Sequence, residues 1–161
     1  IVPPVLCGAT RVSSSEIRTA LEHGDFATVT RLLGRPYTMR GRVVQGERLG
    51  RQLGYPTANL RMNRLRAPLH GIFAVRVRGV SGTGAYDAMN GVASLGTRPT
   101  VGGVEPLLEV HVFDFAGDLY GRQLEVEFVA KLRDEAHFAS LELLVAQMHA
   151  DVAAARRILY A

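Results

Sequence analysis

In the stretch Leu108-Glu109-Val110-His111-Val112-Phe113, aliphatic residues occupy every second position, and Glu109 and His111 lie between them. A period of two is typical of a β-strand that buries one face. The stretch therefore predicts a strand with its aliphatic side chains in a core. A carboxylate turned into that core would be unfavourable, so Glu109 either faces solvent or belongs to a functional site.

The same alternation recurs along most of the chain. It covers residues 39–43, 73–78 and 124–130, with a weaker run over 86–95 and a short strand after Asn59. The connections are short and rich in glycine, and no helical pattern separates the strands. About six strands in this order exclude a parallel βαβ arrangement and favour an antiparallel barrel or sandwich.

Two short helices are predicted before the strands. Ser13 followed by Glu16 is a capping box, and Gly24 ends that helix. Asp25 can cap a second helix that ends at Gly34. Their apolar stripes have no evident partner nearby in the sequence, so we expect them to pack on a part of the protein outside this chain.

A long helix is predicted at the C-terminal end, with Ser140 as its cap and Arg156 and Arg157 in its last turn. We expect it to pack across the barrel and to cover an end or an open seam. Its apolar stripe comprises Leu141, Leu144, Val145, Met148, Val152, Ala155 and Leu159.

A second kind of pattern lies in Gly50-Arg51-Gln52-Leu53-Gly54-Tyr55-Pro56-Thr57-Ala58-Asn59. Its glycines allow the backbone to approach a phosphate closely. Thr57 and Asn59 face the same way on an extended segment and offer hard oxygen atoms to Mg²⁺ or hydrogen bonds to phosphate. The alternative is a plain turn before a strand.

Composition narrows the possible functions. The chain has 161 residues, enough for one domain with a modest appendage, and a formal charge of +4 with a pI near 9.7. This charge fits an anionic ligand such as ATP, and the scattered arginines do not form the basic and aromatic stripe typical of nucleic-acid binding. Cys7 is the only cysteine, the five histidines show no metal-ligand spacing, and no apolar run is long enough to span a membrane. We expect a cytoplasmic protein without a membrane or nucleic-acid partner.

The motif 50–59 resembles the signature of riboflavin kinases. Further blocks follow in the order of that family: Gly91-Val92-Ala93-Ser94-Leu95-Gly96-Thr97-Arg98-Pro99-Thr100, the stretch from Leu108 through Asp114-Phe115, Asp118-Leu119-Tyr120-Gly121, and Lys131-Leu132-Arg133-Asp134-Glu135. The chain as a whole resembles the C-terminal part of the bacterial bifunctional FAD synthetases. Ordered blocks of this kind are far more specific than one glycine-rich motif.

The resemblance implies a mainly β fold with α-helices. A six-stranded antiparallel Greek-key barrel and the long C-terminal helix would form a riboflavin kinase domain over residues 37–161. Residues 1–36 would be the C-terminal remnant of an adenylyltransferase module and a linker, because Val12-Ser13-Ser14-Ser15-Glu16-Ile17-Arg18 looks like a helix start of that module. The chain begins at Ile1 without a methionine, so we expect a fragment that lacks adenylyltransferase activity and whose partner in the full-length protein is that N-terminal module.

The resemblance also implies phosphorylation of the riboflavin 5′-hydroxyl by ATP, which yields FMN and ADP. Glu109 would be the catalytic residue, and Mg²⁺ would be held by Thr57 and Asn59. The predicted ATP-binding residues are Gly46, Gly50, Arg51, Gly54, Thr57 and Asn59.

Flavin contacts are predicted at Phe113, Leu119, Tyr120 and Arg133, with Phe115 as a further candidate. Each has a structural alternative: aromatic residues on strands are often core, and Arg133 could pair with Asp134 or Glu135. The segment Gly96 to Gly103 would form a flap over the site or an ordinary surface loop.

Two other classes of function remain open from the sequence. The chain could be a non-catalytic small barrel that binds nucleotide or nucleic acid. It could also be an interaction domain that uses the N-terminal helices for assembly.

Overall fold

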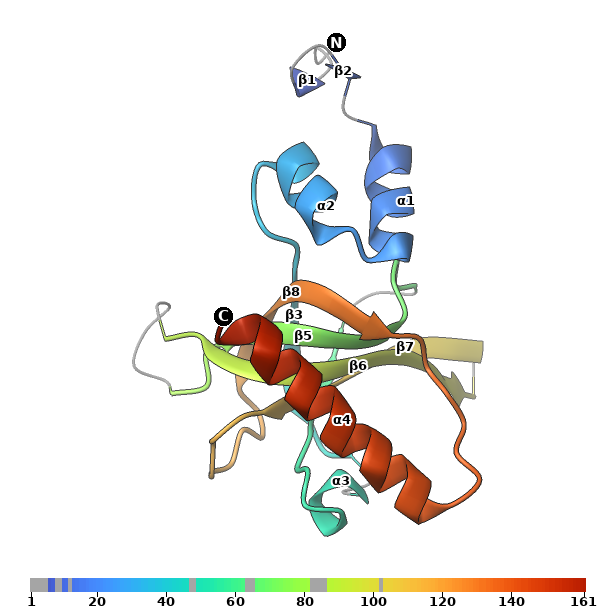
Figure 1. Cartoon of the computed structure of the whole chain (residues 1–161), viewed down its shortest axis with the longest axis vertical. Helices are drawn as coiled ribbons and strands as arrows, with labels where there is room; N and C mark the ends of the chain where they lie inside the picture. The colour runs from blue at the N-terminus through green and yellow to red at the C-terminus, as the bar shows by residue number, and fades with distance from the viewer. Residues whose placement is uncertain are drawn as a thin grey trace.

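A closed barrel forms the body of the molecule, with a pair of helices at one end and a long helix across its outer wall (Figure 1). The computed structural model describes residues 6–7, 10–11, 13–46, 49–62, 66–81, 87–101 and 103–161. A small antiparallel pair, β1 (Leu6–Cys7) and β2 (Thr10–Arg11), precedes the helices. Within the described ranges, no helix is both long enough and apolar enough to cross a membrane.

The barrel has the spatial strand order β3-β4-β7-β6-β5-β8, and all neighbours are antiparallel. The consecutive strands β5, β6 and β7 lie side by side, and β8 then returns to pair with β5. This arrangement is a Greek key. The predicted six-stranded Greek-key barrel is therefore confirmed. The strands are β3 (Thr38–Val44), β4 (Ala58–Arg61), β5 (Gly71–Arg78), β6 (Met89–Thr100), β7 (Gly103–Val112) and β8 (Gln123–Arg133).

Alternation along the strands separates an inner core from an outer wall. Phe73, Val75 and Val77 of β5 are fully buried in the main core, whereas Ala74 between them belongs to a second cluster under the C-terminal helix. The predicted run over 86–95 forms β6 from Met89 onward, and its first residue, Tyr86, falls outside the described part.

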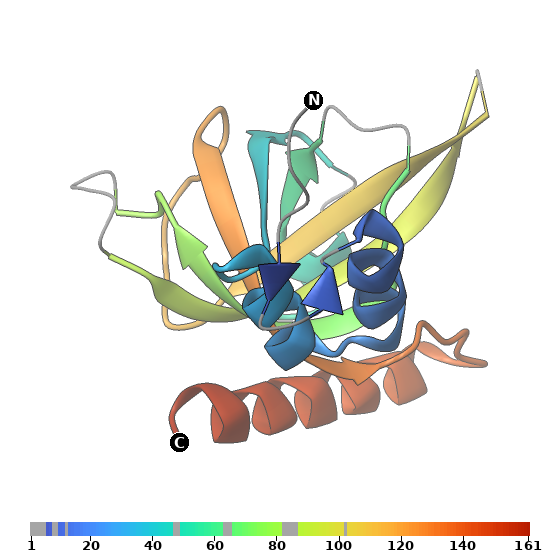
Figure 2. The ribbon, with the colours of Figure 1, turned by 90° about the horizontal axis from the view of Figure 1, so that it is seen from above.

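The helices α1 (Ser14–His23) and α2 (Phe26–Leu33) begin and end as predicted, with a capping box at Ser13 and left-handed glycines at Gly24 and Gly34. The expectation that they have no partner within the chain is wrong. Phe26 inserts into the barrel end, with its ring centroid 6.0 Å from those of Phe73 and Phe128, and the helices cover that end (Figure 2). The apolar stripes thus extend the barrel core.

The long helix α4 (Leu141–Leu159) is capped by Ser140 as predicted. It packs on the outer wall through Ala155 and Leu159, which meet Ala74 of β5. The predicted packing of α4 across the barrel is confirmed. The predicted cover of an end or open seam is wrong, because the barrel is closed and α1 and α2 cover its end. Leu141 remains 52% exposed, so the buried stripe is shorter than the sequence pattern.

The predicted flap is a β-hairpin and not a surface loop. Strands β6 and β7 remain paired as far as Thr100 and Gly103, so the hairpin projects beyond the barrel (Figure 2). Arg98 and Glu105 form an ion pair across it. Its mobility stays a prediction.

Candidate active site

The centre of the site is a row of polar side chains across three neighbouring strands. Asn59 of β4 lies opposite Glu109 of β7, and Glu109 lies opposite Ser94 of β6. The residues that flank Glu109 along its strand, Leu108 and Val110, are in the main core. The row therefore faces the outside of the barrel, which is the lower-energy orientation for a carboxylate on such a strand.

Glu109 is half-buried in this position, and Asn59 is only 9% exposed. Thr57 directly precedes β4 and is two residues from Asn59, so alternation places both on the outer face. The structure thus brings the predicted metal ligands and the predicted catalytic carboxylate together, although they are far apart in the sequence.

The glycine-rich segment folds back on itself before it enters β4. It contains a short helix, α3 (Leu49–Gln52), which the sequence pattern did not predict. The Gly50 carbonyl accepts hydrogen bonds from the amides of Leu53 and Tyr55, at 3.1 and 2.8 Å, and Gly54 has a φ of +84°. Arg51 lies in α3, and its side chain falls outside the described part of the structure.

Gly50 is required by this fold-back. A Cβ at Gly50 would lie 2.4 Å from the Tyr55 carbonyl oxygen and 3.3 Å from Thr57 Oγ1. The backbone of the segment therefore lies directly against the predicted metal ligand.

Gly46 approaches the other predicted ligand even more closely. A Cβ at Gly46 would lie 1.7 Å from Asn59 Nδ2, 2.6 Å from its Cγ and 3.1 Å from its Oδ1. The amide nitrogen of Asn59 thus packs against the bare Cα of Gly46, and its oxygen lies farther from that contact. A side chain at position 46 would therefore force the Asn59 amide to move.

We expect Gly46→Ala to displace the Asn59 side chain and to reduce turnover roughly 10-fold or more, because a misplaced binding group forfeits much of its effect. Steady-state kinetics at several Mg²⁺ concentrations would measure this. Gly34→Ala is a control, because a Cβ there meets nothing within 4 Å, although its positive φ carries some strain. Normal metal dependence in Gly46→Ala would contradict the role of the Gly46–Asn59 contact.

The predicted flavin residues fall in three different environments. Phe113 is 2% exposed and packs beneath α4, under the guanidinium of Arg156 at 4.5 Å from the ring centroid. Leu119 is buried in the main core, whereas Tyr120 is 63% exposed. The structure does not bring these three together with Glu109 as one surface, and Phe113 occupies the core position that its structural alternative described.

The polar row continues across two more strands to Arg133. Ser94 of β6 lies opposite Ile72 of β5, and Ile72 lies opposite Arg133 of β8. Its guanidinium donates to the carboxylate of Asp151 on α4, from Nε at 2.9 Å and from Nη2 at 2.7 Å. Gln147 donates to the same carboxylate at 2.9 Å. The structural alternative for Arg133, a pair with the Asp134 or Glu135 side chain, is not what the structure shows: the guanidinium pairs with Asp151, and Nη1 donates to the Asp134 backbone carbonyl. The predicted flavin contact of Arg133 stays a prediction.

Asp151 was missed by sequence reasoning, although a signal was present. It lies beside Val152 and three residues after Met148, on the stripe predicted to be buried. An acidic residue on the apolar face of a helix indicates a buried cationic partner. Asp151 is 6% exposed, and its partner is Arg133.

Nearby carboxylates beyond this pair are held ionised by basic neighbours. The hydrogen bond from Arg156 lowers the pKa of Asp114, and the same bond raises the pKa of Arg156. The hydrogen bond with Lys131 lowers the pKa of Asp134. Both carboxylates are therefore ordinary surface ion-pair partners.

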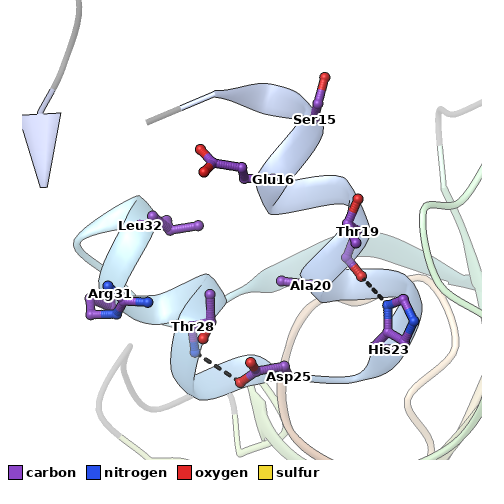
Figure 3. Close-up of a pocket in the computed structure, with 9 residues that line it drawn as sticks. All are labelled: Ser15, Glu16, Thr19, Ala20, His23, Asp25, Thr28, Arg31 and Leu32. Carbon is purple, nitrogen blue, oxygen red and sulfur yellow. Dashed lines mark hydrogen bonds between the residues drawn. The ribbon is translucent and has the colours of Figure 1, made fainter. Parts of the chain in front are cut away.

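An open hollow of about 590 Å³ lies between α1 and α2 (Figure 3). Its walls come from these two helices and the turn between them, so it shares no residue with the polar row. Two hydrogen bonds at the hollow stabilise the helices. His23 Nδ1 bonds the Thr19 carbonyl, and the Thr28 amide donates to the Asp25 carboxylate. Its lining comprises Ser15, Glu16, Thr19, Ala20, His23, Asp25, Thr28, Arg31 and Leu32.

Similarity to known proteins identifies the family. The family model described as "Flavokinase: Riboflavin kinase" matches residues 33–159. The chain belongs to the riboflavin kinase family. It is 47% identical, over 92% of its length and 47% of the relative's, to a bifunctional riboflavin kinase/FMN adenylyltransferase of Haemophilus influenzae.

Solved structures resemble this riboflavin kinase family member as well. A riboflavin kinase from Trypanosoma brucei superposes with a TM-score of 0.54 at 26% identity, and the match covers 78% of this chain and 80% of that one. A protein from Streptococcus pneumoniae, named a macrolide-efflux protein, superposes with a TM-score of 0.78 at 38% identity over 94% of this chain and 48% of that one. The chain spans about half the length of the curated bifunctional relatives.

Proposed function

We propose that this chain transfers the γ-phosphoryl group of ATP to the 5′-hydroxyl of riboflavin and releases FMN and ADP. Membership of the riboflavin kinase family supports the reaction class. The observation that carries the proposal is the register that pairs Asn59 with Glu109 on adjacent strands, beside the glycine-rich segment. A group that holds phosphate and a group that accepts a proton are thereby neighbours, as phosphoryl transfer to an alcohol requires.

Magnesium would be held by Thr57 and Asn59 together with the ATP phosphates. Within the described ranges, no group of three or more His, Cys, Asp or Glu residues could hold a metal ion. Two neutral oxygen donors suit an ion that keeps most of its ligands from nucleotide and water, as Mg²⁺ commonly does. The absence of a side chain at Gly46 leaves space for the Asn59 amide, which fits a role of Asn59 as a metal ligand. Bound Mg²⁺ would neutralise negative charge on the transferred phosphoryl group.

Glu109 would orient the riboflavin hydroxyl and accept its proton. The O–P bond to the acceptor forms as the bond between the γ-phosphorus and the β,γ-bridging oxygen of ATP breaks, and ADP leaves with the electron pair. The position of Glu109 on the outer wall, opposite Asn59, supports this role because acceptor and nucleotide must meet between the two residues. Gly46, Gly50, Gly54 and the Arg51 backbone would line the nucleotide side.

The flavin ring would lie on the α4 side of Glu109, toward Arg133. Arg133 occupies the same outer row and has N–H groups beyond those given to Asp151 and Asp134. Tyr120 is exposed and so accessible to a ligand, whereas Phe113 and Leu119 are buried, and the flavin contacts of all three stay predictions. Residues 37–161 would carry this activity, with an adenylyltransferase module preceding them in the full-length protein.

The direct test is to incubate the chain with riboflavin, ATP and Mg²⁺ and to separate FMN, FAD and ADP by chromatography. FMN and ADP in equal amounts, without FAD, are expected. Binding of single-stranded nucleic acid with a steep salt dependence, without FMN formation, would instead support the non-catalytic barrel.

We expect Asn59→Ala to weaken Mg-ATP binding and turnover together, because it removes an oxygen donor from the metal and the side chain that packs against Gly46. A roughly 10- to 100-fold fall in kcat/KM is expected, with a higher Mg²⁺ requirement. Asn90→Ala is a matched control, since Asn90 lies opposite Arg76 and away from the polar row. Unchanged metal dependence in Asn59→Ala would remove Asn59 from the metal site.

A further inference from the structure

Tyr55 joins the glycine-rich segment to two histidines from different elements. Its ring centroid lies 5.3 Å from that of His111 on β7 and 5.3 Å from that of His149 on α4. The interplanar angles are 79° and 77°, so both are edge-to-face contacts. Such contacts are favourable beyond the area that they bury. We refer to Tyr55, His111 and His149 as the aromatic clasp.

The clasp is reinforced by a hydrogen bond at the next residue. His111 Nδ1 lies 2.9 Å from the carbonyl oxygen of Pro56. A carbonyl can only accept, so Nδ1 carries the proton and donates. Pro56 immediately precedes Thr57, so this bond anchors the chain one residue before the first predicted metal ligand.

Each histidine is presented by a rigid support. His111 lies on β7, two residues from Glu109, within a closed barrel. His149 lies on α4, which the Arg133–Asp151 pair and the buried Ala155 hold against the barrel wall. The clasp therefore connects the glycine-rich segment to two fixed parts of the molecule, one of which also carries the catalytic carboxylate.

We propose that His111 and His149 are positioning residues for phosphoryl transfer. Through Tyr55 and Pro56 they hold the glycine-rich segment in the conformation that presents Thr57 and Asn59 beside Glu109. This inference rests on the function proposed above, and it adds α4 to the elements that determine nucleotide binding. Without the clasp, only a fraction of molecules would have the segment in its binding conformation, and the apparent affinity would fall by that fraction.

The kinetic test compares four clasp variants and one control variant with the intact chain. We expect His149→Ala to raise the KM for Mg-ATP roughly 3- to 10-fold, because one ring contact is lost. His111→Ala should raise it roughly 10- to 50-fold, because a hydrogen bond is lost as well. The kcat should stay within about twofold in both variants, since bound nucleotide selects the competent segment.

Conservative replacements separate positioning from a loss of fold. His149→Phe keeps a ring beside Tyr55 and should restore the KM. His111→Asn places an amide N–H near the position of Nδ1 and should recover most of the loss. His23→Ala is the matched control, because His23 Nδ1 makes a comparable bond to the Thr19 carbonyl at 2.7 Å, on α1.

Hydrogen exchange supplies a readout that does not need turnover. The Tyr55 amide, which donates to the Gly50 carbonyl, should exchange faster in His149→Ala and His111→Ala, and Mg-ATP should restore its protection. A KM within twofold of the intact chain in both alanine variants, with unchanged exchange over residues 49–57, would overturn the clasp. An intact chain that forms no FMN would instead refute the proposed function, and the exchange comparison would still decide whether the clasp orders the segment.

Discussion

Replacing Glu109 with Gln is expected to lower kcat by about 10²- to 10⁴-fold, which is the usual contribution of a positioned general base. The amide keeps the size of the carboxylate and can still hydrogen-bond, but it cannot accept the proton of the riboflavin hydroxyl. Nucleotide binding should change little, because in the proposed site the phosphates would be held by the glycine-rich segment and β4. Single-turnover formation of FMN, together with Mg-ADP binding measured by calorimetry, separates the two effects.

The control for this substitution is Glu22→Gln, an exposed carboxylate on α1. Equal kcat values for Glu109→Gln and the intact chain would exclude proton transfer to Glu109. A fall in nucleotide affinity that matches the fall in kcat would instead assign Glu109 to binding.

The second large effect is expected at Asp151. Asp151→Ala leaves Arg133 and Gln147 without their shared acceptor at the contact between β8 and α4. Breaking one side of a buried ion pair typically costs about 3–5 kcal/mol of unfolding free energy, and we expect a loss at the lower end because the Arg133 side chain is 23% exposed. Urea denaturation followed by circular dichroism measures this loss.

Asp134→Ala is the matched control for Asp151→Ala. It removes an ion pair with Lys131 from a carboxylate that is 85% exposed, and solvent screens such pairs, so little change is expected. Equal stabilities of the two variants would show that Asp151 does not anchor α4. Arg133→Met combined with Asp151→Leu should recover part of the stability, since no charge is then left unpaired.

The local features of this chain follow closely from its sequence. The helix caps at Ser13, Asp25 and Ser140 depend on residues within three positions of one another, and all three are present in the structure. The period-two strands and the glycine-rich connections were enough to predict an antiparallel barrel. The Greek-key order came from the family resemblance, because strand order is not encoded in any single segment.

Contacts between distant segments could not be predicted in the same way. Phe26 meets Phe73 and Phe128, but nothing in the sequence near Phe26 indicates which aromatic residues it will contact. The pattern of α4 correctly predicted a buried face, but the depth of burial at each position depends on the barrel wall that it meets. Leu141 belongs to the predicted stripe but remains 52% exposed.

The candidate site likewise combines residues that local spacing could predict with contacts between distant segments that it could not. Thr57 and Asn59 could be proposed from their own spacing, since both lie on one short segment. The placement of Glu109 beside Asn59 depends on the register of β4 against β7, and a shift of one residue would turn Glu109 into the core. Asp151, the partner of Arg133, and His149, one of the two partners of Tyr55, lie on α4, whose position is set by packing and not by local pattern.

The closure of the barrel has a consequence for the synthesis of the protein. Strand β3, the first of the barrel, is bonded on one side to β8, the last. A nascent chain that has not yet reached residue 133 therefore exposes an open sheet with two unpaired edges, which is a surface prone to association. The final hydrogen bonds form only when the two ends of the barrel sequence meet, and a loop of this length makes folding slow relative to a helical domain of the same size. We therefore expect incomplete chains of this protein to be more prone to aggregation than the closed barrel.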